Sequence, residues 1–94
     1  MAEKELTPEE TSKIFEEVKE LLTGMLNDRS VPRNIKRVSQ KCIDELNRTD
    51  ETSGVLSANA MYSIGDISTD PNVPFHTRTT VYRIISILER VKDS

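Results

Sequence analysis

Residues that could do chemistry gather at two places in this 94-residue chain, each directly after a proline. One group follows Pro32 and the other follows Pro74. The two groups comprise Arg33, Asn34, Lys36, Arg37, His76, Thr77 and Arg78. Proline presets the first turn of a helix, and the free N–H groups there attract anions, so we expect contacts with a phosphate or carboxylate of a partner. The structural alternative is that Asn34 and His76 bond to local backbone while the basic side chains face solvent or pair with glutamates.

A third group lies on one face of the segment 53–68, which is expected to be helical. Its members are Asn59, Tyr62 and Asp66. A catalytic or metal-binding role for Asp66 would need other groups to converge on it, and this segment offers a single carboxylate. The simpler interpretation is that Asp66 pairs with Arg78 or Arg83, or caps the turn that follows.

Cysteine and histidine are too scarce for a metal centre or an internal disulfide. The chain has one cysteine, Cys42, and one histidine, His76, whereas a structural zinc site takes four such ligands. Cys42 lies on an apolar helical stripe, which favours an inert buried thiol. The sequence also lacks a glycine-rich phosphate loop, paired catalytic acids and a nucleophile motif. We therefore expect no catalytic residues, no metal and no cofactor.

Composition indicates one small domain spanning 1–94, with residues 1–6 as a flexible tail. Hydrophobic residues make up 35% of the chain and charged residues 31%, a balance typical of helices with a narrow apolar stripe. The net charge of −3 argues against binding to duplex nucleic acid, which usually takes a basic domain. The chain has neither a signal-peptide core nor an apolar run of about 20 residues, so we expect a cytoplasmic protein with no membrane contact.

The elements that must position these groups are four helices, expected at about 8–26, 32–48, 53–68 and 74–92. Each carries apolar residues at helical spacing, and no stretch alternates with the period of two that a strand shows. The start of the first helix has the clearest signal in the sequence. Thr7 precedes Pro8, and Glu10 stands three residues after Thr7, which is the spacing of a capping box.

The chain repeats itself at an interval of 42 residues, with copies at roughly 8–48 and 50–90. In the 21 positions from Asp28 onward, six residues are identical in the shifted sequence. The matched turns, Asp28–Val31 and Asp70–Val73, each begin with the aspartate that a type I turn favours, and a helix-starting proline follows each. Because one helical hairpin cannot bury its own apolar stripe, we predict an all-α, compact four-helix bundle made of two duplicated antiparallel hairpins.

Two stretches give the chain a family resemblance: "VPRNIKR" at residues 31–37 and "DPNVPFHTRT" at residues 70–79. With them the chain resembles a small archaeal protein family of helical bundles that has no assigned activity, and the likeness covers nearly the whole chain. The resemblance implies a helical bundle and an archaeal origin, and it implies no function. Lys36 stands where the family is expected to have arginine, and Val73 where methionine is expected. A fainter similarity to HEAT-type hairpins implies protein binding by analogy.

The segment 53–68 is unusual because Asp66 is its one charged residue. A helix with so little charge is not expected to lie half exposed, so a second face should be covered. That face comprises Gly54, Ser57, Ala58, Met61 and Gly65. Its cover is either another helix of the same chain or a second subunit or partner protein.

Three functional hypotheses follow. The leading hypothesis is a non-enzymatic protein–protein interaction module or small subunit. It would bind a protein partner or associate with itself, for example as a homodimer, through helix 53–68. The alternative is an RNA- or nucleoprotein-associated factor that uses the basic helix starts. The third is a small enzyme, which would need Asp66, Tyr62 and His76 to meet in one pocket.

Overall fold

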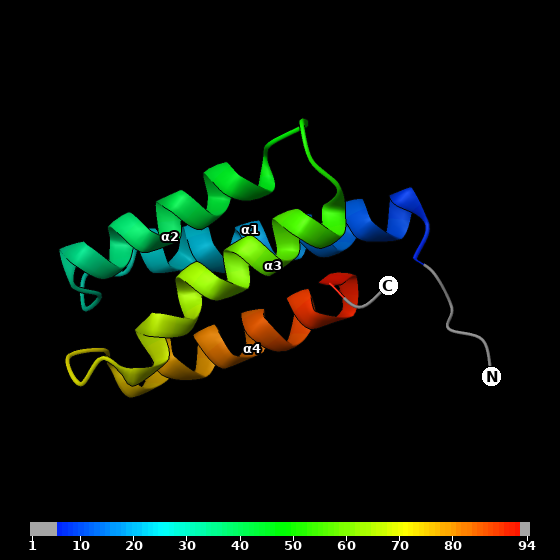
Figure 1. Cartoon of the computed structure of the whole chain (residues 1–94). Helices are drawn as coiled ribbons and strands as arrows, with labels where there is room; N and C mark the ends of the chain where they lie inside the picture. Colours follow the sequence, from blue (N-terminus) through cyan, green and yellow to red (C-terminus); the bar gives the residue numbers. More distant parts are fainter. Residues whose placement is uncertain (1–5, 93–94) are drawn as a thin grey trace.

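The computed structural model describes residues 6–92, and its first helix, α1 (Pro8–Leu26), begins where the capping pattern predicts (Figure 1). The Thr7 hydroxyl accepts a hydrogen bond from the Glu10 backbone N–H at 3.1 Å, and the Glu10 carboxylate accepts one from the Thr7 N–H at 2.9 Å. This reciprocal pair satisfies two N–H groups that a helix start otherwise leaves free. Residues 1–5 of the predicted tail lie outside the described residues, and Leu6 packs partly buried against the core.

Three more α-helices follow close to their predicted positions. They are α2 (Arg33–Leu46), α3 (Ser53–Gly65) and α4 (Phe75–Lys92). Pro32 and Pro74, expected as the first helical residues, each stand one residue before the helix. They keep the role of starting it, because the Pro32 carbonyl accepts the N–H of Lys36 at 3.1 Å and the Pro74 carbonyl accepts the N–H of Arg78 at 3.0 Å.

The third predicted helix is shorter than expected. After Gly65 the chain tightens into a 3₁₀ turn, η1 (Asp66–Thr69). The hydroxyls of Ser68 and Thr69 each donate to the backbone carbonyl three residues earlier, at 2.8 Å and 3.0 Å. Such side-chain bonds compete with the regular helical pattern and account for the tightening.

The two predicted turns have the same hydrogen bonds. In each, the valine N–H donates to the aspartate carbonyl, at 3.2 Å for Val31 and Asp28 and at 3.2 Å for Val73 and Asp70. The N–H two residues after the aspartate donates to its carboxylate, at 2.8 Å in the first turn and 2.9 Å in the second. Both valines are buried, so each turn also anchors itself in the core.

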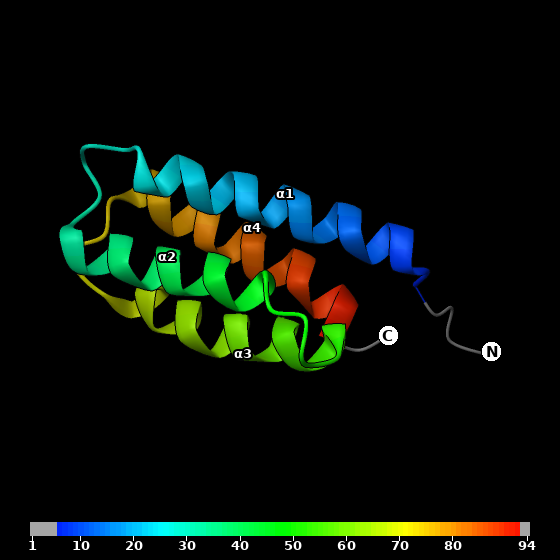
Figure 2. The same cartoon turned by 90° about the horizontal axis from the view of Figure 1, so that it is seen from above.

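The four helices form a bundle in which each lies against two others. α1 contacts α2 and α4, and α3 also contacts α2 and α4. In both views the chain runs one way along α1 and α3 and the opposite way along α2 and α4 (Figures 1 and 2). Residues 6–92 contain no strand, so the predicted all-α four-helix bundle is confirmed.

Burial follows the 42-residue interval. Every buried residue from Ile14 to Leu46 is matched by a buried residue 42 positions later. The first set comprises Ile14, Phe15, Val18, Leu22, Met25, Val31, Ile35, Ser39, Cys42 and Leu46. Both halves of the chain therefore supply the same positions to one shared core. Duplication of a hairpin stays a prediction, and this pattern agrees with it.

Candidate functional site

The start of α2 presents a row of basic side chains. Arg33, Arg37 and Lys41 are exposed and stand four residues apart, so they lie along one side of the helix. None of these three, which we term the basic row, forms an ion pair with another described residue. Asn34 is exposed as well, and Lys36 is half-buried. The helix has no side-chain cap at its N-cap residue, so the basic row meets an open helix start.

The start of α4 is tied to the first turn through His76. Its Nε2 lies 2.7 Å from Oδ2 of Asp28 and 3.4 Å from the Ser30 hydroxyl. The Ser30 hydroxyl donates to the other Asp28 oxygen at 2.6 Å. In a catalytic triad the histidine meets serine and acid through different ring nitrogens, whereas one nitrogen of His76 lies against both. His76 therefore links α4 to the first turn and does not cap its own helix.

Asp28 is the acidic member of this link. Hydrogen bonds from Ser30 and His76 lower its pKa from 3.8 to about 2. Hydrogen bonds of this kind stabilise the charged form of a carboxyl group. At neutral pH, Asp28 is therefore a fixed negative charge between the turn and α4.

The residues after His76 hold two buried polar atoms without a hydrogen-bond partner in the described chain. These atoms are Thr77 Oγ1 and Arg78 Nε. Thr77 is 1% exposed, and its counterpart in the first half of the chain is the buried Ile35. Arg78 donates through Nη2 to the Asp70 carbonyl at 3.1 Å, which ties α4 to the second turn. The core thus accepts an apolar side chain at one of the paired positions and a hydroxyl at the other.

The small-residue face of α3 is partly covered by its own chain. Ser57 is buried and donates to the Leu88 carbonyl of α4 at 2.6 Å. The Cys42 thiol of α2 donates to the Ala60 carbonyl at 3.6 Å, and burial raises the pKa of this thiol to about 11. The thiol is protonated at neutral pH, as expected for an unreactive cysteine. The other residues of the small-residue face of α3 are half-buried: Gly54, Ala58, Met61 and Gly65.

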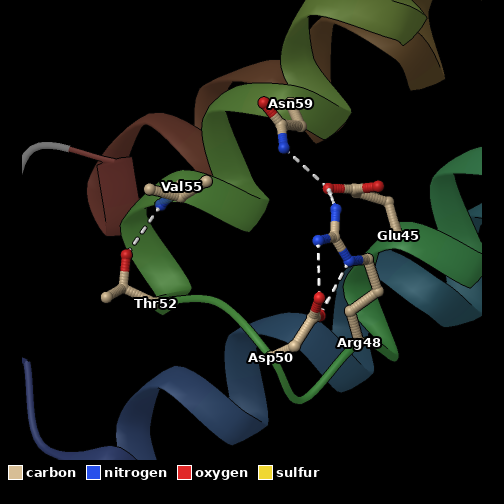
Figure 3. A network of polar contacts seen from close by, with 6 residues as sticks. All are labelled: Glu45, Arg48, Asp50, Thr52, Val55 and Asn59. Atoms are coloured by element: carbon tan, nitrogen blue, oxygen red, sulfur yellow. Dashed lines mark hydrogen bonds and ion pairs between the residues drawn. The ribbon is translucent and has the colours of Figure 1, made fainter.

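Asn59 belongs to a polar network that secures the connection between α2 and α3 (Figure 3). Its amide donates to the Glu45 carboxylate at 2.7 Å, and Arg48 donates to the same carboxylate at 2.9 Å. Arg48 also donates to both carboxylate oxygens of Asp50 at 2.9 Å, which holds the pKa of Asp50 below its ordinary value. Asn59 therefore has a structural role in joining two helices.

Tyr62 and Asp66 do not join these contacts. Tyr62 is 85% exposed, and Asp66 opens the 3₁₀ turn. Neither arginine predicted to pair with Asp66 does so, because Arg78 binds a backbone carbonyl and Arg83 lies 3.8 Å from Glu17. Among residues 6–92, no three or more His, Cys, Asp or Glu side chains are placed to hold a metal ion.

A cavity of about 240 Å³ lies between α1 and α4, beside His76. Glu20, Gly24 and Asp28 line it from the first half of the chain, and Thr77 and Thr80 line it from α4. A more open hollow of about 430 Å³ lies between α1 and α2. Of the residues predicted to form a site, His76 and Thr77 line the first cavity and none lines the second. The cavity beside His76 does not reach Tyr62 or Asp66, the other members of the small-enzyme hypothesis.

The partners of His76 were missed by prediction. Asp28 and Ser30 precede it by 48 and 46 positions, and the repeated turn was their one signal in the sequence. That signal marks Asp28 as a turn residue and does not mark it as a partner of a histidine in the other half.

Comparison with known proteins places the whole chain in one family. The pattern of the Uncharacterised protein family (UPF0147) matches residues 2–91. The chain belongs to the UPF0147 family. A UPF0147 protein of Methanocaldococcus jannaschii is 43% identical over 91 residues, which cover 97% of this chain and 95% of that protein. Another, of Methanothermobacter thermautotrophicus, is 39% identical over 83 residues, which cover 88% and 81%.

A solved structure also resembles this UPF0147 chain. The crystal structure of a family member from Thermoplasma acidophilum has a TM-score of 0.81 and 34% sequence identity, covering 86% of this chain and 95% of that one. These findings confirm the predicted resemblance to an archaeal family of uncharacterised function. No helix within residues 6–92 is both long enough and apolar enough to cross a bilayer.

Proposed function

We propose that this UPF0147 protein is a non-enzymatic protein–protein interaction module that binds through the outer face of α3, formed by Val55, Ala58 and Tyr62. The observation that carries the proposal is that the 13 residues of α3 include no charged side chain, although Tyr62 is 85% exposed and Val55 41%. Surface helices normally carry charge on their solvent side, so an uncharged face with large exposed side chains is typical of a binding surface.

Helical geometry separates this outer face from the core. Val55, Ala58 and Tyr62 lie on one side of α3, opposite the buried Leu56 and Ala60. α2 and α4 both pack against α3, so the outer face points away from its two neighbours. Interface centres are enriched in tyrosine and depleted in charge, which favours a protein as the occupant, whether a second copy or another chain.

Sedimentation velocity and site-specific crosslinking test this proposal. A photoreactive phenylalanine analogue at position 62, expressed in cells of the native host, should crosslink to a second copy or to one defined protein. The matched control places the analogue at Phe75, which is similarly exposed at 82% but lies on α4. A protein that sediments as a monomer and gives the same crosslinks from both positions would contradict the proposal.

The basic row favours a second candidate function, binding to a polyanion such as single-stranded RNA. Arg33, Arg37 and Lys41 are exposed, evenly spaced and free of ion pairs among residues 6–92, so their charge is available to phosphates. The combined change Arg33→Glu and Arg37→Glu should weaken RNA binding and reduce its salt dependence by about 0.7 per lost phosphate contact, measured by fluorescence anisotropy. Arg90→Glu, an exposed change on α4, is the control. Equal effects of both changes would argue against this function.

We propose no catalytic role, cofactor or metal for the chain, and we place it in the cytoplasm. The Ser30 hydroxyl donates directly to the Asp28 carboxylate, so His76 does not activate it as a nucleophile. The single cysteine, buried and unpaired, suits a reducing compartment.

A further inference from the structure

The two halves of the chain differ in the side chains that they expose to solvent. Among residues 6–92, the exposed large hydrophobic side chains all belong to the second half: Val55, Tyr62, Phe75 and Tyr82. The residues 42 positions earlier are exposed too, and each is charged or polar: Lys13, Glu20, Arg33 and Gln40. The core that the two halves share therefore does not account for the apolar side chains on the outside of α3 and α4.

The outer face of α3 is too small to form a stable interface by itself. A standard interface engages roughly 20–30 residues on each partner, whereas α3 has 13 residues in all. α3 lies between α2 and α4, so the interface has to continue onto one of them (Figure 1). The outer side of α2 carries the basic row, whereas α4 carries Tyr82, which is 55% exposed. Because interface centres are depleted in charge, the continuation is α4.

Tyr82 lies on the side of α4 that is turned towards α3. Arg78 stands four residues before it on the same side, and it donates to the Asp70 carbonyl just after η1. The opposite side of α4 is marked by Arg83, which lies 3.8 Å from Glu17 of α1. Tyr82 therefore borders the outer face of α3 and extends it.

Apolar side chains occupy the space between Tyr62 and Tyr82. Ser57 bonds to α4, and Met61 follows Ser57 by four residues on the same side of α3. Met61 and Ile85, the latter three residues after Tyr82, are partly buried and pack against the core. The charged residues on this side of α4 stand towards its two ends: Arg78 and Glu89. We term the uncharged centre the α3–α4 surface, which comprises Val55, Ala58, Met61, Tyr62, Tyr82 and Ile85.

Tyr62 and Tyr82 lie at the same level along the bundle. Ser57 of α3 donates to the Leu88 carbonyl of α4, which fixes one helix against the other, and the two helices run in opposite directions (Figures 1 and 2). Tyr62 comes five residues after Ser57 and Tyr82 six residues before Leu88, which places them about 7.5 Å and about 9 Å along the same direction. A two-fold axis between α3 and α4, parallel to both, therefore carries each tyrosine over the position of the other.

We propose, building on the interaction function above, that the partner is a second copy of this chain. The two α3–α4 surfaces pack face to face about this axis, so that Tyr62 of each subunit contacts Tyr82 of the partner subunit. A surface that meets its own copy needs an uncharged centre, because a charge near the axis faces a like charge. The α3–α4 surface meets this condition, and its paired tyrosine rings add a favourable aromatic contact.

The size and packing of the bundle agree with such a dimer. Across the interface each helix lies antiparallel to its new neighbour, which is the arrangement that the bundle already uses. The chain exposes 6144 Å², so a face made by two of the four helices offers at most about 1,500 Å². A standard interface uses roughly 800 Å² of each partner, which fits on that face.

Two substitutions that introduce opposite charges test this arrangement: Tyr62→Lys and Tyr82→Glu. Sedimentation velocity of the full chain should show a monomer–dimer equilibrium as the wild-type concentration rises. Each variant alone should raise the dissociation constant of the dimer at least about 30-fold, because a central tyrosine is lost from both subunits. Both side chains are exposed in the monomer, so circular dichroism should show folded variants. Gln40→Lys and Gln40→Glu make the same charge changes at the counterpart of Tyr82 and should leave the dissociation constant unchanged.

Mixing the two variants tests the direction of the axis. In a mixed dimer, the introduced lysine of one chain faces the introduced glutamate of the other, and the second contact keeps both native tyrosines. An equimolar mixture with one variant fluorescently labelled should therefore dimerise at least about ten-fold more tightly than either variant alone. No gain on mixing would overturn this arrangement, because an axis that places α3 against its own copy gives no such pairing.

The remaining outcomes also overturn the proposed dimer. A dimer that both tyrosine substitutions leave intact would have its interface on another face. A chain that stays monomeric at every concentration would not have a second copy as its partner. In that case, crosslinking from position 62 to a different protein in the native host would leave the proposed interaction function standing. Absence of any crosslink from position 62 would remove both.

Discussion

The starts of α2 and α4 follow turns with the same hydrogen bonds, yet the residues that come next differ in chemistry. After Pro32 the chain places charged side chains outward and buries Ile35. After Pro74 it exposes Phe75 and His76 and buries a threonine whose hydroxyl has no partner in the described chain. The residues that the two helix starts share are explained by their role in forming the bundle. The residues that differ are not explained by the fold.

The two helix starts also differ in where their polar side chains point. The first helix start presents its polar groups to solvent, where the basic row can meet a partner. The second helix start buries Thr77, and its exposed His76 bonds to Asp28 of the first turn. Equivalent positions in the two halves of the bundle therefore carry different side-chain chemistry.

The largest expected effect tests whether the halves are equivalent in the core. Leu46→Ala and Leu88→Ala change paired residues that are 4% and 0% exposed. Each should lower the free energy of unfolding by about 2–5 kcal/mol, because each removes buried methyl groups and leaves a cavity. Urea denaturation followed by circular dichroism measures both values. A decrease in the free energy of unfolding below about 1 kcal/mol for one variant would show that the paired positions do not contribute equally to stability.

The next comparison places a hydroxyl-bearing side chain at position 35 and an apolar one at position 77. Ile35→Thr should lower the free energy of unfolding by about 1–3 kcal/mol, because it buries a hydroxyl in an apolar site. Thr77→Val should leave that free energy unchanged or raise it by up to about 1 kcal/mol, because it removes a hydroxyl without a partner. The same urea experiment measures both. A clear destabilisation by Thr77→Val would mean that the hydroxyl is satisfied within the folded protein.

A smaller gain in stability is expected at Gly24. Gly24→Ala should raise the free energy of unfolding by about 0.5–1 kcal/mol, since the helix gains propensity and the new methyl group meets open space. Gly65→Ala is the matched change, because a Cβ there also meets nothing within 4 Å. It should gain less, since Gly65 is the last residue of α3 and its propensity counts for less at the helix end. Thermal melts of the two variants compare them directly.

Local patterns made most of the fold predictable. The first helix was predicted with both of its observed ends, because Thr7, Pro8 and Glu10 specify its start through bonds within four residues. The repeated turns were predicted for the same reason, since an aspartate side chain bonding two residues ahead is a local event. The 3₁₀ turn after Gly65 was missed, because hydroxyl bonds of Ser68 and Thr69 outweigh a helical pattern that otherwise continues.

The candidate site was predictable in part. His76 and Thr77 stood out because they lack counterparts of the same type in the first half of the chain. Their environment depends on contacts between segments more than 40 residues apart, such as the bond from His76 to Asp28. No local pattern encodes such a contact. The free hydroxyl of Thr77 is likewise a property of the assembled bundle, since its neighbours in the same helix find backbone partners.

The smallest expected effect concerns the acid that joins the two halves. The pKa of Asp28 is lowered from 3.8 to about 2 in the folded protein, so its contribution to stability is present above pH 3.8 and is lost as the pH falls toward 2. Thermal melts should therefore show wild type above Asp28→Asn at pH 5, with the gap closing as the pH approaches 2. His76→Ala removes one of the hydrogen bonds that lower the folded pKa of Asp28, so the fall in stability below pH 3.8 should be smaller than in wild type and complete at a higher pH. A gap that stays constant from pH 5 to about pH 2 would show that Asp28 acts through turn geometry alone, and that the link between the halves carries no charge-dependent stability.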